Sequence, residues 1–164
     1  MPVRLGHEKL KVYERGLRHV AWMYTVLSGV EKYAVVIDHW TRAAESVLVN
    51  IANGNSRRSR ADRNHYFDVA IGSALECAAC LDICLRREMI SNDQLLAGKR
   101  MLQPIVSMTV GLRDAVSAYV KEERSPYLAG QPRIFFAHEG LDAYKVALEL
   151  VSWFHCLLGG TDMG

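Results

Sequence analysis

Three cysteines have a spacing that could begin a metal site. Cys77, Cys80 and Cys84 are three and four residues apart, so their thiols share one face of a helix. Thiolates are common zinc ligands, but neither a histidine nor a second pair of cysteines follows nearby to complete a set of four. We therefore interpret the three thiols as small apolar side chains on a packing face. We expect no metal, no other cofactor and, including the fourth cysteine Cys156, no disulfide.

A second candidate for chemistry is the pair Arg60 and His65, with Asn64 directly before the histidine. The spacing is similar to that of helical ribonucleases of the HEPN group, in which a histidine beside an arginine acts on a ribose 2′-hydroxyl. An arginine-rich turn followed by any helix satisfies so loose a pattern. We therefore favour a protein that is not an enzyme, with the ribonuclease as a less favoured alternative.

Basic residues are concentrated in two stretches of a nearly neutral chain, whose formal net charge is +2. Residues 57–63 contain four arginines and one aspartate, and the first predicted helix adds four basic side chains and His19. Clustered cations neutralise phosphates, so we predict binding of RNA or a nucleoprotein, with a solvated basic surface and only protein partners as the alternative. The candidate nucleic-acid contacts are Lys9, Lys11, Arg15, Arg18, Arg57, Arg58, Arg60 and Arg63.

Helices must position these residues, because apolar side chains recur every three or four residues through most of the chain. No segment alternates with a period of two for long enough to suggest a strand. Short connections favour antiparallel neighbours, so we predict an all-α protein: an antiparallel up-down four-helix bundle with one additional C-terminal helix. The expected helices cover about residues 7–27, 33–52, 60–87, 91–121 and 138–158.

Capping and helix-breaking residues predict where these helices end. Ser59 or Asp62 can cap the third helix, and Gly54 is expected to end the second helix in a left-handed conformation. Pro104 should kink the fourth helix. Gly72 falls inside the third helix, where glycine costs about 1 kcal/mol relative to alanine. We therefore expect a neighbouring helix to approach closely at Gly72.

The fifth predicted helix repeats the first at a shift of 131 residues. Nine of 23 aligned positions are identical without a gap. Helical periodicity explains matching leucines and valines, but it seldom reproduces a His-Glu pair, a tyrosine and a tryptophan as well. The identical pairs are His7/His138, Glu8/Glu139, Leu10/Leu141, Tyr13/Tyr144, Leu17/Leu148, Val20/Val151, Trp22/Trp153, Leu27/Leu158 and Gly29/Gly160.

The repeat predicts the domain organisation. We expect a four-helix bundle at 7–124, a turn-rich linker at 125–137, and an extra helix at 138–158 that resembles the first helix of a second module. The apolar stripe of this helix must be buried on its own bundle, in a neighbouring subunit, or in a tandem module of which only the start is present. Apolar runs are too short to span a membrane and the N-terminus lacks the apolar region of a signal peptide, so we expect a cytoplasmic protein.

The second and third predicted helices carry residues that resemble the signature of the 23S rRNA intervening-sequence proteins. The family pattern, Arg-Ala-Ala-x-Ser-Ile-x-x-Asn-Ile-Ala-Glu-Gly followed by Arg and Ser, is similar to residues 42–54 and 57–59. Asn53 replaces the usual glutamate, and His39 stands where glutamine is common. The resemblance extends over about residues 7–120 and includes Leu10, Val12, Tyr13, Phe67, residues 70–74 and Glu76.

This resemblance implies a four-helix bundle that forms a homo-oligomer, often a homopentamer, without a demonstrated reaction or a small-molecule substrate. Related accessory variability proteins of diversity-generating retroelements use a basic surface to bind nucleic acid and a reverse transcriptase. RNA or a reverse transcriptase is therefore the implied partner, and the family motif suggests a subunit contact at Asn50. A protein scaffold without nucleic-acid binding is the alternative, which the extra helix favours.

Overall fold

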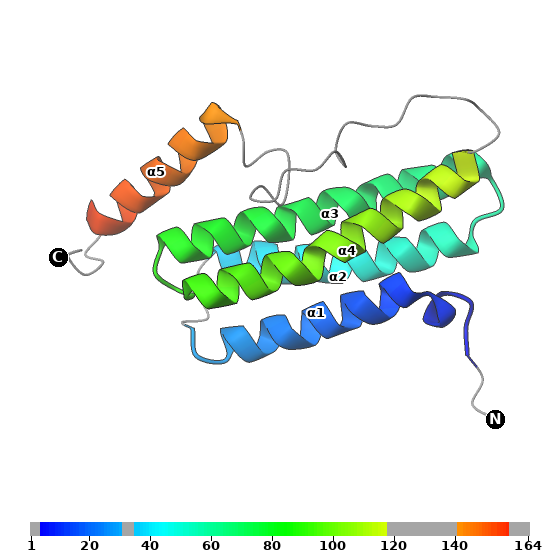
Figure 1. Cartoon of the computed structure of the whole chain (residues 1–164), viewed down its shortest axis with the longest axis horizontal. Coiled ribbons are helices and arrows are strands. Elements are labelled where there is room, and N and C mark those ends of the chain that lie inside the picture. The colour runs from blue at the N-terminus through cyan, green and yellow to red at the C-terminus, as the bar shows by residue number, and fades with distance from the viewer. Residues whose placement is uncertain (1–3, 31–34, 118–140, 158–164) are drawn as a thin grey trace.

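The computed structural model describes residues 4–30, 35–117 and 141–157, and these residues are helical wherever they have regular structure (Figure 1). The all-α prediction is confirmed, since no strand occurs in these three ranges. In the described ranges, one short 3₁₀-helix precedes five α-helices. Their bounds are η1 (His7–Lys9), α1 (Lys11–Leu27), α2 (Val35–Ser56), α3 (Arg60–Arg86), α4 (Asn92–Ser117) and α5 (Asp142–Leu157).

Several helix ends differ from the prediction. The first helix is interrupted at Leu10, which has extended backbone (φ −81°, ψ 124°) between η1 and α1. The second helix continues through Gly54 to Ser56, so the left-handed C-cap predicted at Gly54 is wrong. The predicted end of the fourth helix near residue 121 and the predicted linker at 125–137 lie outside the described residues.

Side-chain caps explain where α3 and α4 begin. The Ser59 hydroxyl accepts a hydrogen bond from the Asp62 backbone N–H at 3.4 Å, so Ser59 is the cap of α3. Ser91 and Gln94 form a reciprocal capping box before α4. The Gln94 amide oxygen accepts from the Ser91 N–H at 2.8 Å, and the Ser91 hydroxyl accepts from the Gln94 N–H at 3.2 Å.

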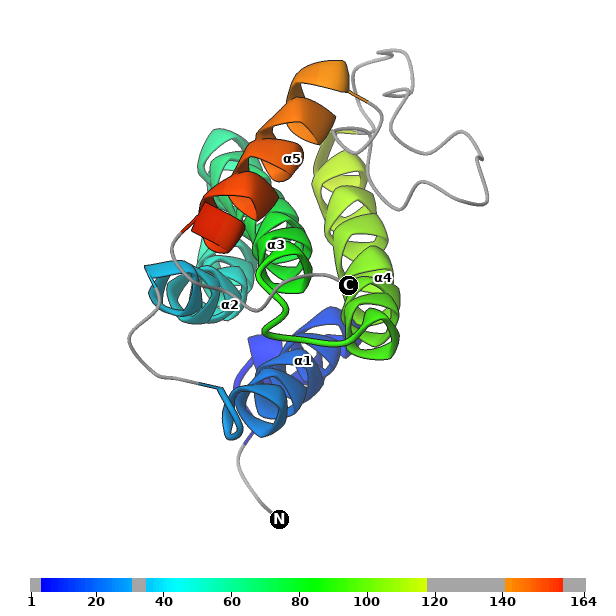
Figure 2. The same ribbon diagram turned by 90° about the vertical axis from the view of Figure 1, so that its left-hand side faces the viewer.

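Helices α1–α4 pack around one apolar interior. Contacts join α1 to α2 and α4, and α3 to α2 and α4, which supports the predicted four-helix arrangement in part. Figure 2 shows these four helices nearly end-on, with α5 lying outside them against α3. All four contribute large side chains to the interior. The largest apolar side chains with almost no exposed surface are Trp40, Phe67, Met23, Ile51, Leu81, Leu102 and Ile105.

Glycines allow close approach at three points of this interior, but not at Gly72. A Cβ atom on Gly54 would lie 2.7 Å from the Phe67 ring, and one on Gly98 would lie 2.7 Å from the Trp22 ring. A Cβ on Gly16 would lie 2.7 Å from a Leu48 methyl. The close contact predicted at Gly72 is wrong, because within the described ranges no neighbouring helix brings a heavy atom within 4 Å of the position of its Cβ.

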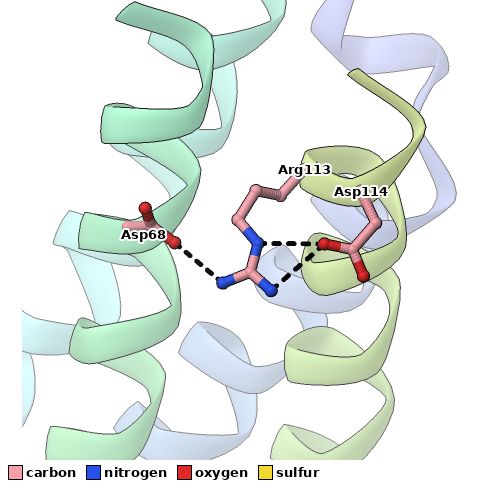
Figure 3. Close-up of polar contacts among 3 residues, drawn as sticks. All are labelled: Asp68, Arg113 and Asp114. Carbon is pink, nitrogen blue, oxygen red and sulfur yellow. Dashed lines mark hydrogen bonds and ion pairs between the residues drawn. The ribbon is translucent and has the colours of Figure 1, made fainter. Parts of the chain in front are cut away.

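Within the described residues, ion pairs join α3 to α4 near both ends. At one end, the Arg113 guanidinium donates to Asp68 on α3 at 3.0 Å and to its neighbour Asp114 at 3.1 Å (Figure 3). These hydrogen bonds, with that to Asp68 first, raise the pKa of Arg113. Towards the other end, Lys99 Nζ lies 2.6 Å from a carboxylate oxygen of Asp82, and both side chains are buried.

Candidate nucleic-acid interface

The start of α1 and the turn between α2 and α3 lie at the same end of the molecule (Figure 1). The short helix η1 contacts α2, and a Cβ on Gly6 would lie 3.1 Å from the Asn55 side-chain nitrogen. This contact brings Lys9 and Lys11 to the end that carries the arginine-rich turn. The structure therefore joins the two basic stretches, which are about fifty residues apart in the sequence.

Arginines of the turn are held in two different ways. Arg57 stacks on the Tyr66 ring, with its guanidinium carbon 4.8 Å from the ring centre, and it donates a hydrogen bond to the Tyr66 hydroxyl at 2.9 Å. Arg58 and Arg60 are exposed and form no ion pair with the described residues. The Arg63 side chain is half-buried, and its Nε has no acceptor among the described residues. The turn thus presents both fixed and free cations.

From this end, the basic residues of α1 continue along the helix towards its C-terminus. Lys11, Arg15 and Arg18 are exposed and lie on one side of the helix, at a spacing of four and three residues. Trp22 continues the same side and packs at Gly98, so the stripe lies on the α4 side of α1. Arg18 forms an ion pair with Glu14 of its own helix. The eight predicted contacts therefore form a cluster at one end and a stripe leading from it, not a single compact patch.

His19 is buried and does not belong to this basic surface, contrary to prediction. Only 2% of its surface is exposed, and neither ring nitrogen has a hydrogen-bond partner among the described residues. The ring centre lies 5.7 Å from that of Trp22 and 6.5 Å from that of Trp40. Burial lowers the pKa of His19 to about 4. The side chain is therefore a neutral member of an aromatic cluster in the interior.

Arg60 and His65 are both exposed at the start of α3. Five residues along an α-helix correspond to a rotation of about 140°, so the helix does not direct the two side chains to one point. The His65 ring instead lies 5.5 Å from the Tyr66 ring, in an edge-to-face arrangement. This geometry gives the ribonuclease alternative no support.

Cys77, Cys80 and Cys84 line the interior side of α3 and are buried, which confirms that they are packing residues. Burial raises the pKa of Cys80 to about 12 and that of Cys84 to about 11, so both remain protonated at neutral pH. Within the described ranges, no group of three or more histidine, cysteine or acidic side chains is arranged to hold a metal ion.

The residues that suggested a family likeness form a polar contact between α2 and α3. The hydroxyls of Ser46 and Ser73 are 2.8 Å apart, and Ser46 also accepts from the Asn50 amide at 3.0 Å. Asn50 donates a second hydrogen bond to the Ser46 backbone oxygen at 2.8 Å. The serines therefore bridge the two helices directly, and Asn50 orients one of them.

Sequence reasoning missed the buried Asp82–Lys99 pair and the Arg57–Tyr66 stack. Asp82 and Lys99 occur in the middle of helical patterns, where charged residues are usually exposed. They are buried because α3 and α4 pack together at that point. The local sequence pattern of either helix does not predict this contact. Tyr66 follows Arg57 by nine positions. This spacing does not predict a contact between them unless the geometry of the intervening turn is known.

Among solved structures, the chain is similar to a protein of unknown function from the S23 ribosomal protein family of Bacteroides thetaiotaomicron VPI-5482. The TM-score is 0.57 and the identity 22%, over 62% of this chain and 97% of that one. A likeness at this identity shows a shared fold. No curated protein matches the chain.

A family model described as 23S rRNA-intervening sequence protein matches residues 8–111. The matched segment includes the basic turn, the Ser46–Ser73 bridge and most of α1–α4. It ends before α5, so α5 lies outside the matched segment. Since the model covers well over half of the sequence, the chain belongs to the family of 23S rRNA-intervening sequence proteins.

Proposed function

We propose that this protein is a non-catalytic, oligomeric four-helix-bundle protein that binds RNA or a nucleoprotein partner, such as a reverse transcriptase, through its basic end. The observation that carries the proposal is that η1 and the start of α1, which contain Lys9 and Lys11, lie at the same end of the molecule as the arginine-rich turn (Figure 1). Phosphate binding is a sum of such contacts, and several copies of the chain would multiply it.

The details of the turn suit an anion. Arg57 is pre-oriented by Tyr66, so little side-chain freedom is lost when it meets a phosphate. Arg58 and Arg60 have no competing acid among the described residues. Arg63 has a buried Nε without an acceptor, which a ligand oxygen would satisfy.

The proposal includes a homo-oligomer in the cytoplasm. Apolar side chains remain exposed on the outer face of α1 and α2, where the Tyr24 hydroxyl also bonds Glu45 at 3.2 Å. Leu17, Tyr24 and Val49 are each about half exposed, at 48%, 51% and 57%. Such a face is suited to contact with another copy. No helix in the described part of the chain is long and apolar enough to cross a membrane.

The test is salt-dependent binding of a labelled single-stranded RNA of mixed sequence. We expect the double variant Arg58→Ala/Arg60→Ala to weaken binding and to reduce the slope of log affinity against log salt. The slope should fall by about 1.4, because each phosphate contact on a single strand contributes about 0.7. Light scattering on the same samples, with and without RNA, reports the number of copies.

The matched control is Arg86→Ala/Arg100→Ala, which removes the same charge from exposed arginines far from the turn. Equal losses in both double variants would show that overall charge, and not this end, attracts RNA. The absence of any RNA binding at low salt would favour the alternative function, a protein scaffold without nucleic-acid binding. Shortened RNA after incubation, abolished by His65→Ala, would instead favour the ribonuclease.

A further inference from the structure

The helix that repeats α1 does not bury the face that α1 buries. In α1, the buried residues are Val12, Gly16, His19, Met23 and Leu27, and the first four have counterparts within the described part of α5. A shift of 131 residues places Ala143, Ala147, Leu150 and Phe154 at the corresponding positions of α5. All four are apolar and exposed, and the exposed fractions of Leu150 and Phe154 are 52% and 50%.

Helix α5 packs on α3 with a different side. Its partly covered residues are Tyr144, Leu148, Val151, Ser152 and His155, and the Tyr144 hydroxyl donates to Asp82 on α3 at 2.8 Å. At about 100° per residue, this side is turned about a quarter to a third of a rotation from the face that matches the interior of α1. Helix α5 therefore has two apolar sides, of which α3 covers one.

The uncovered side is wide enough for another helix. Val146 and Trp153 border the four matching positions and are exposed by 62% and 55%. Trp153 and Phe154 contact each other edge to face, with ring centres 5.1 Å apart. Exposed aromatic and aliphatic side chains gathered along about three turns of one helix mark a surface that binds another protein. We call the six residues Ala143, Val146, Ala147, Leu150, Trp153 and Phe154 the α5 free face.

The size of the side chains changes along this face in a way that suits its own copy. The N-terminal half carries Ala143, Val146 and Ala147, and the C-terminal half carries Leu150, Trp153 and Phe154. In an antiparallel pair of α5 helices, Ala143 would lie opposite Phe154 of the second copy and Ala147 opposite its Leu150. Large side chains would then fill the space above small ones along the whole contact. A parallel pair would set large against large and small against small.

We propose that the α5 free face binds the same face of a second copy of this chain, as an antiparallel two-helix contact with twofold symmetry. Such a contact is isologous, since both copies present the same patch. In an antiparallel pair, the positive end of each helix dipole also lies beside the negative end of the other, which is electrostatically favourable. The proposal does not depend on RNA binding or on any assembly of α1–α4.

The first test compares the mass of the full-length chain and of two variants over a range of concentrations, by sedimentation or light scattering. The double variant Leu150→Glu/Phe154→Glu places charges inside the pair. We expect it to associate about tenfold more weakly or worse, because each buried unpaired charge opposes the contact. The control Leu141→Glu changes a leucine that is 59% exposed but lies off the free face, and it should keep the wild-type mass.

If α1–α4 also assemble, the paired α5 helices link two assemblies, and the double variant halves the mass. Identical masses for the wild type and the double variant at every concentration would overturn the proposal. Circular dichroism checks that both variants keep their helices. The basic end is unchanged in all three proteins, so each should still bind RNA. Failure of this proposal and failure of the proposed function are therefore distinguishable.

The second test determines the direction of the helices by disulfide formation. Ala143→Cys and Phe154→Cys are made separately, each with Cys156→Ser, which removes the exposed native thiol. In an antiparallel pair the two engineered thiols of different copies are opposite, whereas equal positions are about 16 Å apart along the axis. Disulfides need Cα atoms within about 7 Å. A mixture of the two variants should therefore form a mixed disulfide dimer.

Either variant alone should remain largely uncross-linked. Cross-linking of each variant with itself would show a parallel pair, and no cross-linking in the mixture would show that the free face does not meet its copy. Both results would overturn the proposal. In the latter case, protection of the free face from surface labelling in a monomer would identify another segment of the same chain as its cover.

Discussion

His19 lies on the buried side of α1, beside Trp22 and Trp40, with no hydrogen-bond partner for its ring nitrogens among the described residues. Its neutral form is tolerated there, but its charged form is not, because burial removes the water that would solvate it. The repeat offers an internal comparison, since the corresponding residue of α5 is Leu150. A leucine at this position thus retains the helical pattern without the ionisable ring.

We expect acid to destabilise the protein through His19. Burial lowers its folded-state pKa from 6.5 to about 4, so the unfolded chain binds the proton more readily. Stability from this residue is complete above about pH 6.5, falls as the pH drops towards 4, and changes no further below that value. The total loss is about 3 kcal/mol.

Urea unfolding at several pH values between about 4 and 7 measures this loss. Other groups titrate in the same range, so the quantity of interest is the difference between the wild type and His19→Leu. The variant should lack the additional acid-dependent loss. Parallel stability curves for the two proteins would contradict the assigned environment of His19.

Thiol reactivity separates the four cysteines. Burial places Cys77, Cys80 and Cys84 out of reach and raises the pKa of each thiol, whereas Cys156 is exposed on α5. A thiol reagent at neutral pH should therefore react quickly with one group in the native protein and with all four after unfolding. Cys156→Ser should abolish the fast reaction, and a remaining fast thiol in that variant would refute the buried placement of the three residues of α3.

At the scale of the helix, glycine has two distinct roles in this fold. Gly98 on α4 lies where Trp22 of α1 and Leu81 of α3 meet, so its missing side chain allows three helices to approach. Gly72 on α3 lies in a helix interior with open space around it. The same residue type is therefore a packing requirement at one place and a local weakness at the other.

Alanine substitutions test this difference. We expect Gly98→Ala to lower the free energy of unfolding by about 1–3 kcal/mol, because the new methyl must displace Leu81 or the Trp22 ring. We expect Gly72→Ala to raise it by up to about 1 kcal/mol, because alanine is the better helix former. Urea unfolding of the two variants measures both values. A destabilising Gly72→Ala would show that another surface packs against α3 at this residue.

At the scale of the whole molecule, α5 is joined to the other helices through a buried ion pair. The Asp82 carboxylate binds Lys99 of α4 through one oxygen and accepts from the Tyr144 hydroxyl through the other. A buried carboxylate of this kind is costly without partners, so each contact on it stabilises the arrangement. Tyr144 is also one of the residues identical between the two repeated helices, where its counterpart is Tyr13.

Removing the Tyr144 hydroxyl should loosen α5 alone. A hydrogen bond to a charged acceptor contributes about 1.5–3 kcal/mol, so Tyr144→Phe should raise the hydrogen-exchange rate of α5 amides by about tenfold or more. Amides of α1–α4 should exchange as in the wild type, since Asp82 keeps its bond to Lys99.

Tyr24→Phe is a matched control, because the Tyr24 hydroxyl bonds Glu45 on the exposed face between α1 and α2. This variant should leave exchange in α5 unchanged. Equal exchange of α5 in the wild type and in Tyr144→Phe would contradict the role of the Asp82 contact in holding α5.

The sequence by itself determined the all-α class, the order of the helices in the described ranges, two candidates for the cap of α3, the family and the similarity between the first and last helices. These features depend on local spacing, and hydrogen bonds within a helix link residues only four positions apart. The basic residues were also recognisable, because charge is a property of composition. The sequence did not predict that these residues are divided between a cluster at one end and a stripe along α1.

Only the tertiary structure decided which faces are covered. It buried His19, paired Asp82 with Lys99, left Gly72 open, and placed the start of α1 at the same end as the arginine-rich turn. Above all, it turned α5 so that the face matching the interior of α1 is exposed. The reason is physical: two helices with the same pattern can bury different sides, because burial depends on neighbours that are distant in the sequence.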